Sequence, residues 1–236
     1  MRYKTDEKKY AEKRGTGEGA NYKPWIQTGE FGSLGTTATP IDWITGRQVH
    51  LESQPEHLAW YILRFNPYVI DVREQVPLQL DITLELADQL HIQHPLDSKT
   101  HKPVTISTDL LVTTNSGDLM AYSVKASLPG PKEDGAKRLY EKLRLEHEYW
   151  KRQHIKFFII NGETINRTYA HNIRLVTAFY NLPENALDDI SYVKHLIARR
   201  LIKVDLESEE LDFRELAIRY KREVDLCRQY HMESVM

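Results

Sequence analysis

The fold is decided by residues 104–127, which read Val-Thr-Ile-Ser-Thr-Asp-Leu-Leu-Val-Thr-Thr-Asn-Ser-Gly-Asp-Leu-Met-Ala-Tyr-Ser-Val-Lys-Ala-Ser. Two β-rich runs, residues 104–114 and 119–127, flank the turn sequence Asn-Ser-Gly-Asp, and this pattern predicts a hairpin of adjacent antiparallel strands. Asp109 and Lys125 stand sixteen residues apart around the turn. Antiparallel pairing therefore places them across from, or diagonal to, each other and within side-chain reach.

The flanking sequence predicts the rest of an α/β domain. Residues 55–65 have apolar side chains at helical spacing after Ser53, a natural N-cap. Residues 69–80 alternate like a strand that Pro77 interrupts, and residues 81–103 read as a mixed connection. A long helix over 134–153 and a short buried strand over 155–160 follow the hairpin. The predicted order is helix, three strands, helix, strand.

The chain falls into three parts on composition and periodicity. Residues 1–21 are basic and glycine-containing and read as a flexible arm. Residues 22–162 hold the α/β pattern. Residues 163–236 are helical throughout, over about 168–180, 187–200 and 212–230, which predicts a small all-α, winged-helix-like C-terminal domain.

Composition excludes several classes of protein. The 236 residues hold 32 Lys and Arg against 34 Asp and Glu, a net charge of −2, which is ordinary for a soluble domain. No stretch is long and apolar enough for a membrane span and no leader pattern opens the chain, so a cytoplasmic protein is expected. The single cysteine, Cys227, excludes disulfide frameworks and cysteine-rich zinc sites.

The local distribution of charge does not decide whether the chain binds nucleic acid. Residues 1–23 and 129–156 each carry a surplus of three positive charges, which fits a polyanionic partner and a solvated helix face equally well. Lys132, Lys137 and Arg138, all in the second segment, are the candidate DNA contacts.

The candidate catalytic residues are Glu56, Asp109 and Lys125. A carboxylate and a lysine that project together from a strand pair suit metal-assisted hydrolysis of a phosphodiester: Asp109 would hold Mg²⁺, and Lys125 would orient the attacking water or stabilise charge on the phosphate. The alternatives are a plain cross-strand ion pair and, for Glu56 three residues after Ser53, a capping box. The predicted element order, with Glu56 on the first helix of the pattern, Asp109 on the second strand and Lys125 on the third, resembles the restriction-endonuclease-like nuclease core. We therefore interpret residues 22–162 as a catalytic domain with this core.

Further candidates are weaker when taken alone. Glu146 on the second helix is a fourth carboxylate, although a glutamate among lysines and arginines also suits a solvated face. His91, His94 and His101 could hold zinc or could be solvated loop histidines. Ser123 shares a strand face with Lys125 and should point toward the same metal.

The sequence resembles TnsA, the endonuclease subunit of heteromeric cut-and-paste transposases, including those of CRISPR-associated transposons. The resemblance runs from about residue 14 to about residue 180. It rests on these ordered blocks: Arg14-Gly-Thr-Gly17, Tyr22-Lys-Pro-Trp25, Gly46-Arg47, residues 51–56, Asp71-Val-Arg-Glu-Gln-Val-Pro-Leu78, His94-Pro95, Ser107-Thr-Asp109, Ser123-Val-Lys125, and Glu141-Lys-Leu-Arg-Leu-Glu146 with Tyr149-Trp150.

The resemblance implies roles for the candidate residues. Glu56, Asp109 and Lys125 correspond to the catalytic, metal-associated residues of the family. The family has Gln or an acid two residues before the lysine, where this chain has Ser123. The implied Mg²⁺ ligands, which Mn²⁺ would also use, are Glu56, Asp109, Ser123, the Val124 carbonyl and Glu146.

The resemblance also implies a function in a bacterial cytoplasm. The chain would cut the 5′, non-transferred strands at transposon ends, while a TnsB-like recombinase cuts and joins the 3′ ends. The C-terminal part of the chain, residues 163–236, would contact a TnsC-like AAA+ ATPase and DNA. The alternatives are a catalytically silent adaptor that binds DNA and TnsC, and a standalone restriction or repair nuclease with the same core.

Overall fold

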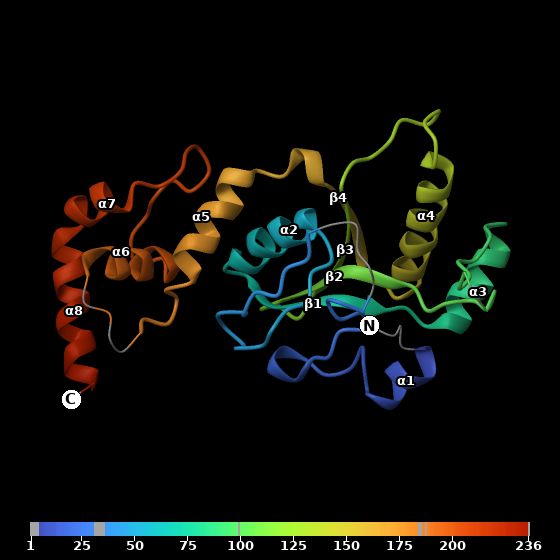
Figure 1. The fold of residues 1–236 in the computed structure, drawn as a ribbon, viewed down its shortest axis with the longest axis horizontal. Helices are drawn as coiled ribbons and strands as arrows, with labels where there is room; N and C mark the ends of the chain where they lie inside the picture. Colours follow the sequence, from blue (N-terminus) through green and yellow to red (C-terminus); the bar gives the residue numbers. More distant parts are fainter. Residues whose placement is uncertain (1–4, 31–35, 99, 184–185, 187, 236) are drawn as a thin grey trace. The chain divides into compact units, whose positions relative to one another are not determined.

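The computed structural model describes residues 5–30, 36–98, 100–183, 186 and 188–235, with side chains up to residue 231 in the last helix. The chain divides into two compact units, Met1–Ile165 and Asn166–Met236, and each is described by itself. The first unit holds a four-stranded mixed sheet with its helices, and the second is helical (Figure 1). The described helices include none that is both long and apolar enough to cross a membrane.

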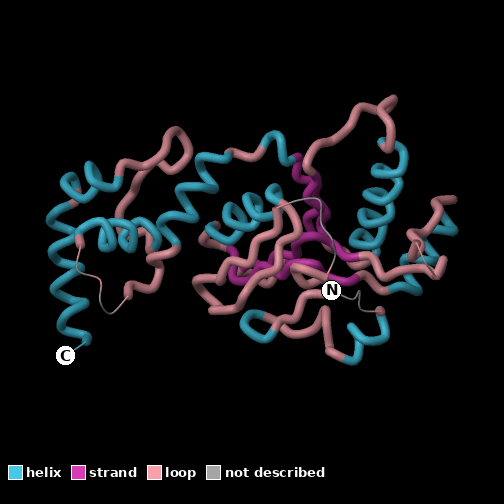
Figure 2. The backbone as a smooth tube through the Cα atoms, viewed as in Figure 1, coloured by secondary structure: helices cyan, strands magenta, loops and turns pink. Residues whose placement is uncertain are grey.

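The sheet contains β1 (Val69–Pro77), β2 (Ser107–Thr114), β3 (Leu119–Lys125) and β4 (Lys156–Asn161), in that spatial order. Figure 2 shows these strands in magenta. The first two pairings are antiparallel, and β4 joins β3 in parallel after the crossover through a helix. The β2–β3 hairpin is therefore confirmed. Leu110, Leu111 and Val112 are all buried, so both faces of β2 are covered, as a strand in the middle of a layered domain requires.

The helices of the first unit place the sheet's polar residues. Helix α2 (Gln54–Phe65) begins where the Ser53 hydroxyl accepts the backbone N–H of Glu56, and it packs against β1 and β3. Helix α4 (Ala136–Arg152) is amphipathic and covers an apolar cluster of the sheet. The buried members of that cluster are Leu78, Leu86, Ala87, Leu111, Ala121, Leu145, Tyr149 and Trp150.

One helix differs from the sequence-based expectation. Residues 80–89 form α3 (Leu80–Gln89), where the sequence indicates an irregular connection, and the helix lies beside α4 (Figure 1). Leu80, Ile82, Leu84 and Leu86 alternate as they would in a strand. The burial of Leu86 and Ala87 in the apolar cluster decides the conformation, because packing overrides a weak local pattern.

The N-terminal segment contacts the sheet domain rather than extending away from it. It contains α1 (Asp6–Ala11) and the short helix η1 (Gly19–Asn21), and residues 1–4 of the expected arm lie outside the described residues. The buried guanidinium of Arg14 pairs with Glu30, and the backbone N–H of Gly19 donates to Asp71 in β1. These contacts explain why a basic, glycine-containing sequence is held against the domain.

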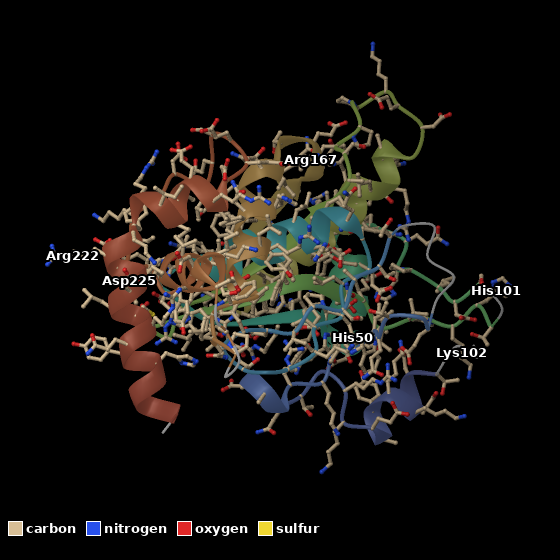
Figure 3. The ribbon with its side chains drawn as sticks, turned by 60° about the vertical axis from the view of Figure 1, so that its left-hand side comes forward. His50, His101, Lys102, Arg167, Arg222 and Asp225 are labelled. Carbon is tan, nitrogen blue, oxygen red and sulfur yellow. The ribbon has the colours of Figure 1, made fainter. Side chains whose placement is uncertain are left out.

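The second unit consists of α5 (Arg167–Thr177), α6 (Asp189–Ala198), α7 (Phe213–Arg219) and α8 (Lys221–Val235), and α6 contacts each of the others. The single helix expected over 212–230 is two helices that meet at Tyr220. The expected start at residue 187 lies outside the described residues. In the described part of this unit there is no strand, so a winged-helix arrangement has no wing here. Arg222 and Asp225 project from α8 (Figure 3).

Candidate active site

The hairpin brings Asp109 and Lys125 into contact. The register pairs Leu110 with Tyr122, so the next position along the ladder sets Asp109 opposite Ser123 and diagonal to Lys125. Asp109 Oδ2 accepts hydrogen bonds from Lys125 Nζ at 2.9 Å, from the Val124 backbone N–H at 2.6 Å and from the Ser123 hydroxyl at 3.2 Å. Three donors therefore fix one carboxylate oxygen at the ends of the two strands.

Glu56 approaches this pair from the first turn of α2. Its side chain is 6% exposed, and its carboxylate accepts from the Ser53 hydroxyl at 2.9 Å and from the Glu52 backbone N–H at 3.1 Å. The capping interaction is therefore present together with burial. Burial, reinforced by the negative charge of Asp109, raises the pKa of Glu56 to about 7.

Glu146 is buried on the inner face of α4 and is not part of a solvated face. Its side chain is 5% exposed, and Oε2 accepts from the Thr108 hydroxyl at 3.2 Å. The indole N–H of Trp150 donates to the same Thr108 oxygen at 2.8 Å, which orients that hydroxyl toward Glu146. Burial, with the charge of Asp109, raises the pKa of Glu146 to about 8, although Lys125 opposes the shift.

Lys125 remains positively charged among these acids. Burial lowers the pKa of its ammonium, but the neighbouring carboxylates of Asp109 and Glu146 outweigh burial, so the net pKa lies above its ordinary value. The site thus combines one fixed ammonium, one carboxylate bonded to it, and two buried carboxyl groups that hold protons near neutral pH.

The donor set suits a hard cation that prefers oxygen. Asp109, Glu56, Glu146 and the Val124 carbonyl supply only oxygen atoms, which are the ligands of Mg²⁺ and Mn²⁺. Within the described residues, no group of three or more His, Cys, Asp and Glu is arranged to hold a metal ion by itself. A cation here would therefore complete its shell with the backbone carbonyl, water or a phosphate oxygen.

Ser123 is entirely buried, with 0% of the residue exposed, and its hydroxyl donates to Asp109. It lies beside Lys125 on the strand pair, as the two-residue spacing predicts. In this arrangement Ser123 orients the carboxylate of Asp109. Its direct use as a metal ligand stays a prediction.

Gln75 in β1 is a further member of this site, which the sequence pattern does not single out. Its amide Nε2 donates to Glu56 Oε2 at 3.3 Å, and its Oε1 accepts from the Ser107 hydroxyl at 2.8 Å. The available signal is a run of polar residues, Arg73-Glu-Gln75, inside an otherwise apolar strand. Such a run in a buried strand requires polar partners.

The three histidines considered for zinc do not meet. His94 is buried and shares hydrogen bonds with the Thr83 hydroxyl at 3.1 Å and the Pro95 carbonyl at 3.0 Å. His101 lies beside Lys102 in the loop between α3 and β2 (Figure 3). No metal-binding group involving His91, His94 or His101 occurs in the part of the chain that the structure describes, so the structure does not support a zinc site in this loop.

The candidate DNA contacts differ in how free they are. Lys132 is exposed in the loop before α4, and the side chain of Lys137 is 91% exposed, 3.9 Å from Glu141. Arg138 is engaged by the Gln93 carbonyl at 2.6 Å and by Glu141 at 3.3 Å. The side-chain ammonium groups of Lys132 and Lys137 can therefore turn toward a phosphate.

A mixed four-stranded sheet with an acid on α2, an acid on β2 and a lysine on β3 defines the restriction-endonuclease-like fold class. Residues 66–162 match the family described as TnsA-like endonuclease N terminal, so the chain carries a TnsA-like endonuclease N-terminal domain.

A curated relative supports the same assignment. Over 162 residues the chain is 33% identical to the transposon Tn7 transposition protein TnsA of Escherichia coli. The match covers 69% of this chain and 58% of that protein, so the chain spans less than two thirds of its relative's length.

Proposed function

We propose that this protein is the DNA endonuclease subunit of a bacterial transposase and that it cuts the 5′, non-transferred strands at transposon ends. The observation that carries the proposal is the 2.9 Å contact of Asp109 with Lys125, beside the buried carboxyl groups of Glu56 and Glu146, inside a TnsA-like domain. The chemistry is hydrolysis of a phosphodiester: the oxygen of a water forms a bond to phosphorus, one bond from phosphorus to a deoxyribose oxygen breaks, and that oxygen takes up a proton and leaves as a hydroxyl end.

The acidic residues would hold the cation. Asp109, Glu56, Glu146 and the Val124 carbonyl would bind Mg²⁺, and Mn²⁺ would substitute for it. When bound, Mg²⁺ would activate a water and neutralise charge on the phosphate. Ser123 and the Val124 N–H keep Asp109 in place by donating to Oδ2.

Lys125 supplies the positive charge of the site. Its ammonium is pinned by Asp109, so it is oriented before substrate arrives. A preoriented cation in a partly dry site stabilises charge that develops on the phosphate and can hold the attacking water by a hydrogen bond. Glu56 and Glu146 would lose their protons when a cation binds, because the cation favours their ionised forms.

Partners would deliver the DNA. The chain has a net charge of −2, and its two basic segments carry only three surplus charges each, too few to hold DNA tightly at physiological salt. Lys132, Lys137 and Arg138 would contact transposon-end DNA locally. The helical unit Asn166–Met236 would bind a TnsC-like AAA+ ATPase, while a TnsB-like recombinase processes the 3′ ends in the cytoplasm.

The test is the structure of the transposition products. In a reconstituted reaction, Asp109→Ala should leave 3′ strand joining intact and convert simple insertions into cointegrates, read by long-read sequencing. Unchanged simple insertions would support a silent adaptor instead. Efficient cutting of unrelated plasmid by the chain alone would support a standalone nuclease.

A further inference from the structure

β1 contains a conformational outlier at the active site. Gln75 has a φ of +49°, in the left-handed region that residues with a Cβ rarely adopt, although it lies inside a strand. The residue is 4% exposed and its flanking pairs, Glu74 with Leu110 and Val76 with Thr108, set it opposite Asp109. An outlier of this kind persists only where the surroundings hold it.

Residues of the N-terminal segment hold the backbone around Gln75 by hydrogen bonds. The backbone N–H of Trp25 donates to the Gln75 carbonyl at 3.1 Å, and the Tyr22 hydroxyl donates to the Glu74 carbonyl at 2.9 Å. The Glu74 side chain, fully buried, is bound by both terminal nitrogens of Arg47. The left-handed turn of the strand is therefore fixed on both sides.

The same conformation directs the side chain between two site residues. The Ser107 hydroxyl donates to Gln75 Oε1 at 2.8 Å and anchors that end of the amide. The amide Nε2 then faces Glu56 and donates to its Oε2 at 3.3 Å. Glu56 is thus held by two donors from the residues just before α2, Glu52 and Ser53, and by one donor from β1.

We propose that Gln75 is a positioning residue that orients the Glu56 carboxylate toward the cation and that the left-handed backbone is maintained for this purpose. The inference rests on the proposed function. Its chemistry is that of an outer partner of a metal ligand: a neutral amide donates to one carboxylate oxygen and leaves the other lone pairs for the cation. An amide suits the role because it carries no charge of its own beside two acids.

The test uses Gln75→Gly in the full-length chain, because glycine accepts the left-handed backbone, so the change removes the side chain and its amide without adding backbone strain. Mn²⁺ binding is measured by calorimetry, and thermal unfolding is followed in parallel. The expected result is an unchanged or higher Tm with Mn²⁺ affinity weakened about tenfold or more, the usual effect of losing an outer partner. Gln79→Ala, at an exposed glutamine four residues along, is the matched control and should bind Mn²⁺ as wild type does.

Ser107→Ala gives a second measurement that leaves β1 unaltered. It removes the hydrogen bond that anchors the amide oxygen of Gln75, so it should weaken Mn²⁺ binding in the same direction as Gln75→Gly. Wild-type affinity in both variants would overturn the role of Gln75. Asp109→Ala separates this failure from failure of the proposed function: if it too binds Mn²⁺ normally, the metal site itself is misplaced.

Discussion

Replacement of Glu146 by Gln should stabilise the metal-free protein at alkaline pH while disabling the site. Glu146 is buried, and its pKa lies at about 8 in the fold against an ordinary value of 4.5. Between these two values the unfolded chain loses the proton that the folded chain keeps. The free energy of unfolding therefore falls as pH rises through this window, and the stabilising effect of the neutral carboxyl group is present in full only below pH 4.5.

The size of the change in the free energy of unfolding follows from the difference between the two pKa values of Glu146. At about 1.4 kcal/mol for each pH unit, the wild-type protein should lose ~4 kcal/mol through Glu146 between pH 4.5 and pH 8. Gln cannot ionise, and its side-chain oxygen can still accept from Thr108, so Glu146→Gln should lack this loss. The variant should equal wild type near pH 5 and exceed it by a few kcal/mol at pH 8.

Urea unfolding in the presence of a chelator, at pH 5 and at pH 8, measures the difference directly. The comparison of the two proteins at each pH cancels the contribution of the titrating groups that do not interact with Glu146. A stability difference that is the same at both pH values would refute the assignment of Glu146 as a buried carboxyl group with a raised pKa.

Two further predictions concern the isolated chain and Ser123. The purified chain should cut naked plasmid in Mg²⁺ little or not at all, because its charge does not hold DNA at physiological salt; robust nicking on an agarose gel without a TnsB-like protein would contradict this. Ser123→Asp should tighten Mn²⁺ binding in calorimetry by adding a carboxylate next to Asp109, whereas Ser123→Ala should reduce cleavage far less than Asp109→Ala; identical affinity of wild type and Ser123→Asp would remove Ser123 from the metal site.

The sequence predicted the parts of the fold that depend on local pattern. The turn at residues 115–118 set the hairpin register, and that register alone was enough to bring Asp109 to Lys125. The N-cap at Ser53 likewise placed Glu56 in the first turn of α2. Turn and capping chemistry act over a few residues, so one sequence is sufficient to read them.

The features that were missed depend on distant contacts. Helix α3 forms because Leu86 and Ala87 reach the apolar cluster, although its alternating leucines resemble a strand. Gln75 adopts its left-handed conformation because the N-terminal segment, fifty residues earlier, bonds to its carbonyl. Glu146 sits among charged residues in sequence, and only the helix orientation shows that it is buried. Periodicity does not contain this information.

The central claim is that the Asp109 and Lys125 pair hydrolyses one defined DNA strand. The most direct measurement is strand-resolved cleavage of an end-labelled transposon-end substrate in the complete transposase, with Asp109→Asn compared with wild type. The account predicts loss of the 5′ strand cut and retention of the 3′ strand cut. Equal 5′ cutting by Asp109→Asn and wild type would contradict it.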